Sequence, residues 1–289
     1  MDTQLLFGKP ITEIIKKRRS VRTYLDKPLS RESKDKLINY LHSLNGLNSP
    51  FPVSIRFALI ECDEAWNISQ AKLGTYGVIK GANTFLAAAV EKKDKNLEQF
   101  GYAFEKVVLF ATSLELGTCW LGGTFKMSEF AKSMNLQDDE IIPCVSPVGY
   151  PAERKSILEK VMRYTAGSNN RKGWPELFFQ EDFDHALKQT EAGRYQIPLE
   201  MLRLAPSASN KQPWRIVKEN NKFHFFLTHT KGYAKLLPHD LQRVDLGIAM
   251  CHFELTAKEM GIEGEWASFH PEISTPENTE YITTWVDLE

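Results

Sequence analysis

The sequence has few cysteines, almost no net charge and no long apolar run, and each shortage excludes a class of protein. Its four cysteines contain no Cys-x-x-Cys pair, which favours reduced, mostly buried thiols over a disulfide framework. No apolar stretch reaches the roughly 18 residues of a membrane span, and the start Met-Asp-Thr-Gln lacks a signal-peptide pattern. The net charge of −1 lacks the basic excess of nucleic-acid-binding proteins. We therefore expect a cytoplasmic protein that binds neither nucleic acid nor membranes.

The familiar catalytic arrangements are also absent. The seven histidines show no metal-ligand spacing. The chain contains no Gly-x-Ser-x-Gly, no P-loop and no Gly-x-Gly-x-x-Gly fingerprint. Cys251 and His252 lie in an apolar helical segment, which favours a place in the core. The sequence thus predicts no metal site and no catalytic side chain.

What is present is an alternation of helical and strand patterns over 289 residues, enough for one large domain or two closely packed ones. Thr12 and Ser30 are expected N-caps of the first two helices. Gly117 and Gly261 are expected just beyond two long apolar helices. The patterns predict helices at 10–19, 30–44, 102–116, 126–134, 195–204 and 246–260, and strands at 53–61, 82–90, 118–121, 141–149, 214–218 and 222–228.

The two long apolar helices resemble each other, which indicates an internal duplication. Thr112, Glu115 and Gly117 match Thr256, Glu259 and Gly261 at a constant spacing of 144 residues. The polar, glycine-containing segment 165–172 is the expected linker. We predict a first unit at 1–165, a linker or crossover at 166–194, and a second unit at 195–289.

The segment Arg18-Arg19-Ser20-Val21-Arg22 has the chemistry of a phosphate site. Guanidinium groups donate paired hydrogen bonds to phosphate oxygens, and a serine adds a hydroxyl. On an extended chain Arg18, Ser20 and Arg22 point to one side. An exposed basic turn explains the segment equally well.

Two further segments can present polar groups to a planar ligand. Pro206, Ser207, Ser209 and Asn210 belong to one loop of small and polar residues, and an asparagine amide can both donate to and accept from a ring edge. A plain turn is the alternative. Gly122 and Gly123 follow a predicted strand, where their N–H groups could lie beside a ligand, although glycine is common in such turns.

Together and in this order, the three segments resemble the flavin-binding parts of the nitroreductase family. The resemblance covers most of the chain and is strongest at 14–28, 74–85, 101–125, 141–178 and 202–217. It implies an α+β fold with a mixed central sheet flanked by helices. Members of that family bind FMN and usually form intertwined dimers, in which the Pro-Ser-x-x-Asn loop comes from the opposite subunit. Here both contributions lie on one chain, so the resemblance implies an internally duplicated, intramolecular pseudo-dimer. Such a chain can complete the site as a monomer, without a second copy.

The resemblance also implies the residues of one FMN site. By this similarity the phosphate and ribityl ligands would be Arg18, Arg19, Ser20 and Arg22, the pair facing the flavin N5 would be Gly122 and Gly123, and the loop would supply Pro206, Ser207, Ser209 and Asn210. Arg171 resembles a late basic residue that returns to the phosphate. Lys80 also lies in a matching segment, without an assigned role. The second unit has Glu265-Trp266 where the glycines would recur.

The implied activity is that of an FMN-dependent NAD(P)H oxidoreductase. Its chemistry is a two-step hydride transfer, from NADH or NADPH to FMN and on to a small nitroaromatic or quinone-like acceptor, which requires no acid or base side chain. Two alternatives stay open: an FMN-binding carrier or sensor that does not turn over NAD(P)H, and a scaffold without a ligand.

Overall fold

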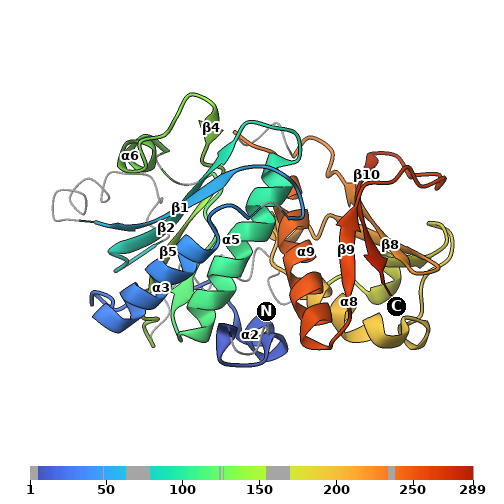
Figure 1. The fold of residues 1–289 in the computed structure, drawn as a ribbon, viewed down its shortest axis with the longest axis horizontal. Helices are drawn as coiled ribbons and strands as arrows, with labels where there is room; N and C mark the ends of the chain where they lie inside the picture. Colours follow the sequence, from blue (N-terminus) through green and yellow to red (C-terminus); the bar gives the residue numbers. More distant parts are fainter. Residues whose placement is uncertain are drawn as a thin grey trace.

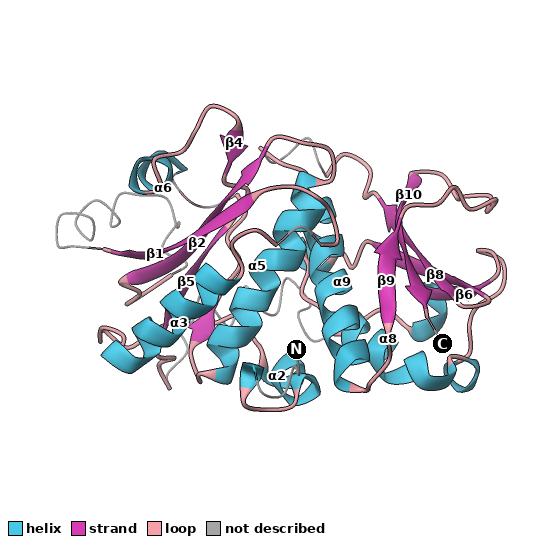
Figure 2. Cartoon of the chain, in the orientation of Figure 1, coloured by secondary structure: helices cyan, strands magenta, loops and turns pink. Residues whose placement is uncertain are grey.

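The computed structural model describes residues 6–47, 49–62, 79–123, 125, 127–153, 170–233 and 238–288. Two five-stranded sheets lie on opposite sides of two long central helices, α5 (Asn96–Ser113) and α9 (Leu241–Glu259) (Figure 1). Both halves of the chain contain helices as well as strands (Figure 2). The predicted α+β class is therefore confirmed. None of the described helices combines the length and the apolar character that crossing a bilayer requires.

The first sheet has the order β1-β2-β5-β3, with β4 paired to β2, and all its pairs are antiparallel. In β2, residues 84–90 are all buried, which explains the continuous apolar run at 85–90. The elements of this half are α2 (Ile11–Lys17), α3 (Arg31–Ser43), β1 (Ile55–Glu61), β2 (Thr84–Glu91), β3 (Gly117–Thr118), α6 (Met127–Ser133), β4 (Glu140–Ile141) and β5 (Val145–Gly149).

The second sheet has the order β6-β7-β8-β10-β9. The hairpin predicted around Glu219-Asn220-Asn221 is confirmed, because β7 and β8 pair antiparallel there. β6 is the exception in the sheet, since it pairs parallel with β7. The elements are β6 (Phe178–Gln180), α8 (Gln196–Arg203), β7 (Trp214–Glu219), β8 (Lys222–Thr228), β9 (Gly264–Ala267) and β10 (Thr279–Asp287).

The two sheets share one topology, which confirms the predicted duplication. The antiparallel order β1-β2-β5-β3 recurs as β7-β8-β10-β9. β6 breaks the correspondence, because it follows β5 in the chain and yet lies at the edge of the second sheet. Part of the predicted linker at 166–194 is therefore built into the second sheet.

The helices α5 and α9 cross where each has a glycine. A Cβ on Gly101 would lie 2.1 Å from the Val244 carbonyl oxygen, and a Cβ on Gly247 would lie 2.0 Å from the Glu98 carbonyl oxygen. The contacts are reciprocal, since Gly247 follows Gly101 and Val244 follows Glu98 by 146 residues. The crossing therefore lies on a local twofold axis that relates the two units.

The structural repeat differs by two residues from the spacing of 144 seen in the sequence. The expected position of Gly117 beyond α5 is wrong: the left-handed residue after this helix is Glu115, with φ 63°, and Gly117 begins β3. Gly261, with φ 70°, follows α9 as predicted. Gly117 is a glycine for another reason, because a Cβ there would lie 2.8 Å from the Val21 side chain.

The expected N-cap at Thr12 is also wrong. The helix α2 begins at Ile11, after Pro10, and no side chain next to it in the sequence caps it. Instead the Glu259 carboxylate, at the end of α9, accepts from the Ile11 N–H and, at 3.2 Å, from the Thr12 N–H. A carboxylate at a helix N-terminus satisfies free N–H groups and opposes the helix dipole. The predicted cap Ser30 is confirmed, since its Oγ accepts from Ser33 N at 3.1 Å.

Candidate functional site

A cavity of about 520 Å³ lies between the two units. Its walls come from the chain after α2, the segment after β3, the start of α9 and the loop after α8, and ten of the eleven predicted site residues contribute to it. Gly123 is the exception: it is exposed and does not line the cavity. The lining residues are Lys16, Lys17, Arg18, Arg19, Ser20, Arg22, Trp120, Gly122, Cys144, Arg171, Pro206, Ser207, Ala208, Ser209, Asn210, Leu241, Val244, Asp245 and Ile248.

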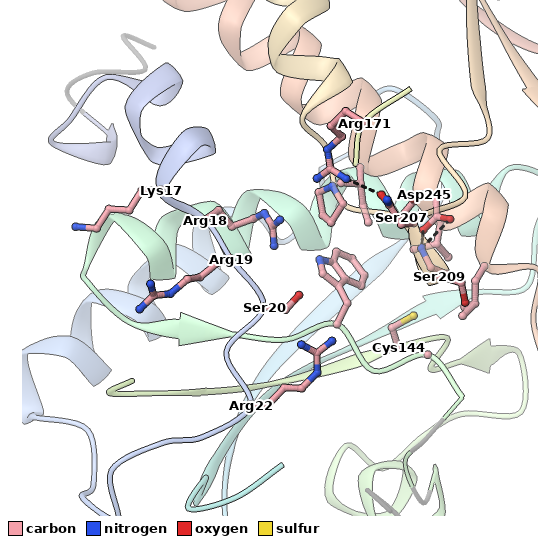
Figure 3. A pocket seen from close by; sticks show the side chains of 18 of the residues that line it. Lys17, Arg18, Arg19, Ser20, Arg22, Cys144, Arg171, Ser207, Ser209 and Asp245 are labelled. Atoms are coloured by element: carbon pink, nitrogen blue, oxygen red, sulfur yellow. Dashed lines mark hydrogen bonds between the residues drawn. The ribbon is translucent and has the colours of Figure 1, made fainter. Parts of the chain in front are cut away.

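One side of the cavity is cationic. Figure 3 shows the guanidinium groups of Arg18, Arg22 and Arg171 around one hollow, while Lys17 extends away from it. Lys17 forms an exposed ion pair with Glu115. The chain after α2 is held extended, because Val21 N donates to the Thr118 carbonyl at 2.8 Å. This strand-like geometry presents Ser20 and Arg22 to the cavity.

Arg171 joins this group from a distant part of the chain. Its Nη1 donates to Asn210 Oδ1 at 2.6 Å, and its Nη2 donates to the Leu204 carbonyl at 3.0 Å. Burial, followed by repulsion from Arg18 and Arg203, lowers the pKa of Arg171 to about 10. The guanidinium therefore keeps its charge at neutral pH, although the fold places it close to like charges. An anion in the cavity would relieve that repulsion.

The loop after α8 is held in an unusual backbone conformation. Ser209, Asn210 and Gln212 all have positive φ, at 50°, 54° and 49°. Such conformations cost free energy and persist only where the surroundings hold them. Here both Asp245 oxygens accept from Ala208 N, at 2.9 and 3.1 Å. The loop is therefore fixed in shape before any ligand arrives.

Asp245 is a buried carboxyl in the cavity wall that the sequence analysis does not predict. Burial raises the pKa of this carboxyl far above its usual range, even though the Ala208 N–H lowers it. The neighbouring Cys144 is also buried, and burial raises the pKa of its thiol, so it is not an activated nucleophile. The signal for Asp245 in the sequence is an acidic residue between the apolar residues Val244 and Leu246 of α9.

Gly122 lines the cavity, and its lack of a side chain has a packing reason. A Cβ there would lie 2.5 Å from Leu241 Cδ1 and 3.1 Å from Cys144 Sγ. The glycine thus lets the segment after β3 approach the start of α9, which belongs to the other unit.

A hydrogen-bonded cluster lies at the position that the internal repeat relates to this cavity. Tyr102 precedes the cavity residue Ile248 by 146 residues, and Trp266 follows Trp120 by the same number. The Tyr102 hydroxyl and the Trp266 indole N–H both donate to Glu254 Oε2, each at 2.6 Å. Tyr102 and Trp266 thus belong to a hydrogen-bonded cluster, whereas their counterparts Ile248 and Trp120 line the cavity.

The loop contacts are duplicated as well. Gln99, 146 residues before Asp245, accepts from Phe51 N at 3.1 Å and donates to the Leu47 carbonyl at 3.1 Å. The loops at 49–52 and 209–213 therefore correspond to each other, and each is held by one side chain of a central helix. Of the residues described in these two loops, those that line the cavity belong to the second unit.

The comparisons with known proteins agree with this architecture. The family that matches residues 10–257 is described as "Putative TM nitroreductase". A "putative nitroreductase" of Thermotoga maritima has a similar structure, with a TM-score of 0.60 and 21% identity over 96% of this chain and 94% of that one. This similarity shows the fold of nearly the whole chain. No curated protein matches the sequence.

Shorter proteins match about half of the chain. A nitroreductase family protein of Clostridium difficile 630 has a TM-score of 0.40 and 19% identity over 53% of this chain and 91% of its own. A nitroreductase with bound FMN from Desulfitobacterium hafniense has a TM-score of 0.39 and 16% identity over 51% and 92%. The family match over residues 10–257 is the finding that assigns the chain, which belongs to the family described as "Putative TM nitroreductase".

Proposed function

We propose that the protein is an FMN-dependent NAD(P)H oxidoreductase with one FMN site between its two units. The observation that carries the proposal is that ten residues, predicted from three separated segments and Arg171, line a single cavity of about 520 Å³. This volume lies within the usual range for cofactor sites. The proposed units are those expected from the sequence, 1–165 and 195–289, with the crossover between them.

The lining of the cavity fits the parts of FMN. Arg18, Arg22 and Arg171 supply guanidinium donors for a phosphate monoester. The Ser207 and Ser209 hydroxyls and the Asn210 amide suit the polar edge of a planar ring. Val244 and Ile248 form an apolar wall for the ring face. The residues present therefore match the chemistry of the whole cofactor, from phosphate to ring.

The chemistry of the reaction then belongs to the cofactor, and the protein provides binding and orientation. Bound FMN would supply the redox chemistry, which is hydride transfer from NADH or NADPH and onward reduction of a small nitroaromatic or quinone-like acceptor. The rigid loop at 206–212 and the arginines hold the ligand in place. The buried wall formed by α9 excludes water from one side. No activated thiol or metal-binding cluster is needed, and we expect the enzyme in the cytoplasm.

An absorption spectrum and a rapid-mixing experiment test the proposal. We expect the purified protein to be yellow, to release its flavin on acid denaturation, and to lose flavin absorbance when mixed with NADH or NADPH. A protein that binds FMN and is reduced by neither donor would support the alternative, a carrier or sensor. A colourless protein that takes up no added FMN would contradict both.

A further inference from the structure

A buried polar cluster lies directly behind the cationic side of the cavity. Its centre is Glu105 of α5, which is fully buried. Trp120 Nε1 donates to Glu105 Oε2 at 2.9 Å, and Arg18 Nε lies 3.9 Å from Glu105 Oε1. Trp120 and Arg18 both line the cavity. Glu105 thus contacts two cavity residues without lining the cavity itself.

The third partner of Glu105 comes from the other unit. His252 of α9 is fully buried, and its Nε2 lies 2.9 Å from Glu105 Oε1. Its Nδ1 lies 3.0 Å from the Met201 carbonyl oxygen in α8. The pair Glu105–His252 therefore connects α5, α9 and α8 beneath the cavity.

The hydrogen-bond geometry determines how many protons the pair holds. A carbonyl oxygen only accepts, so His252 Nδ1 carries a proton. If the imidazole were neutral and Glu105 ionised, the Nε2 lone pair would face a carboxylate at 2.9 Å, and two acceptors cannot form a hydrogen bond. One further proton must lie between these atoms, on the imidazole or on the carboxyl.

We propose that Glu105 and His252 share this proton and act as a positioning pair that holds Trp120 and Arg18 at the cavity without adding negative charge to its wall. The inference rests on the proposed function, because the ligand whose phosphate Arg18 meets is FMN. With the proton the pair is neutral overall; without it the pair carries one negative charge close to Arg18. The Trp120 N–H and the shared proton together give each Glu105 oxygen a hydrogen bond, as a buried carboxyl needs.

Two variants test whether FMN affinity depends on the charge of the Glu105–His252 pair or only on its packing. His252→Gln removes the shared proton and leaves Glu105 as a buried anion 3.9 Å from Arg18, so we expect the FMN dissociation constant to rise about tenfold or more. Glu105→Gln/His252→Gln removes the anion as well, and we expect affinity to return to within about threefold of Glu105→Gln alone. A purely structural role would make the double variant at least as weak as His252→Gln.

Riboflavin, which lacks the phosphate, serves as the second ligand. We expect His252→Gln to weaken FMN binding much more than riboflavin binding, because the added charge opposes the phosphate. Tyr102→Phe is the matched control: it removes a buried hydrogen bond to a carboxylate, Glu254, in the counterpart of the cavity. Its FMN affinity should equal that of the unchanged protein. Equal FMN affinity of His252→Gln and the unchanged protein, or no recovery in the double variant, would overturn the proposal.

A measurement on the ligand-free protein tests the shared proton without FMN. Nitrogen-15 shifts of labelled histidine and carbon-13 shifts of labelled glutamate should show either a doubly protonated His252 or a protonated Glu105. A neutral His252 beside an ionised Glu105 would overturn the shared proton. Failure of the unchanged protein to bind FMN would contradict the proposed function alone, since this spectroscopic result would still stand.

Discussion

Arg171 shows how the cavity is prepared for an anion at the scale of single residues. Its guanidinium is fixed by Asn210 and by the Leu204 carbonyl, and its pKa is lowered to about 10 because it is buried near Arg18 and Arg203. The fold therefore holds like charges together at a cost, and a bound phosphate would offset it. Binding of FMN should for this reason depend strongly on individual arginines.

Arg18→Ala and Arg22→Ala should each weaken FMN binding more than they lower thermal stability. Each variant removes a charge-assisted contact worth about 1.5–3 kcal/mol, which corresponds to about tenfold or more in affinity. Fluorescence titration measures the affinity, and circular dichroism measures the melting temperature. Arg31→Ala is the control, because Arg31 is exposed on α3, outside the cavity. Unchanged FMN affinity in both test variants would mean that the basic segment is only an exposed turn.

Asp245 predicts a pH dependence of stability. Its pKa is raised in the folded protein by burial, so the folded state holds a proton that the unfolded state loses above about pH 3.9. The free energy of unfolding should therefore fall as the pH rises from that value through the folded pKa. Asp245→Asn should lack this contribution, so its stability relative to the unchanged protein should increase with pH.

Urea unfolding at several pH values measures this difference. Asp35→Asn is the control for removing an exposed carboxylate, since Asp35 lies on the exposed face of α3. A difference between Asp245→Asn and the unchanged protein that does not vary with pH would show that Asp245 holds no extra proton in the folded state.

At the scale of elements, the crossing of α5 and α9 determines how the two units meet. The helices approach so closely at Gly101 and Gly247 that a methyl group on either would overlap the backbone of the other helix. Backbone cannot move aside as a flexible side chain can. Both helices also contribute to the site, α9 through its cavity residues and α5 through Glu105. A change at the crossing should thus affect stability and ligand binding together.

Gly247→Ala should destabilise the protein by about 3 kcal/mol or more, because the new Cβ would lie 2.0 Å from the Glu98 carbonyl oxygen. Chemical denaturation provides the measurement. Gly173→Ala is the matched control: Gly173 has an ordinary φ of −62°, and its Cβ would meet the flexible Glu176 carboxylate at 3.3 Å and Pro175 Cδ at an ordinary contact distance of 3.7 Å. Equal stability of the two variants would mean that the helices can separate at little cost.

At the scale of the whole molecule, the duplication has left two unequal positions. One holds the cavity. At the other, Tyr102, Glu254 and Trp266 are joined by hydrogen bonds. The two units therefore resemble the subunits of a dimer in topology, and differ in what fills the equivalent positions between them.

We predict one FMN per chain, and not two. At the other position Tyr102 stands where Ile248 lines the cavity, and it is joined through Glu254 to Trp266. The second unit also has no counterpart of the arginine segment at 18–22. Flavin released by denaturation, measured against protein concentration, gives the stoichiometry, and titration of the flavin-free protein gives the number of sites. Two equivalent sites per chain would contradict the prediction and, with it, the inequality of the two positions.

Local chemistry was enough to predict much of this protein from its sequence. The Ser30 cap, the hairpin of β7 and β8, the buried run in β2 and the polar residues of the three site segments depend on neighbouring residues, whose effects a sequence shows directly. The motif order also indicated that separate segments meet. The sequence pattern predicts no element after residue 260, although β10 is rich in threonine and aromatic residues that favour strands.

Tertiary structure alone decided the features that join distant residues. Glu259 caps α2 in place of Thr12, Asp245 holds Ala208, and His252 meets Glu105, each across more than 30 residues of sequence. The repeat of 146 residues follows from the helix crossing, whereas matched residue types suggested 144. No local pattern encodes such pairs, because they depend on which surfaces the folded units bring together. The sequence therefore determined which chemical groups the site contains, and the packing of the two units determined where they stand and how they are charged.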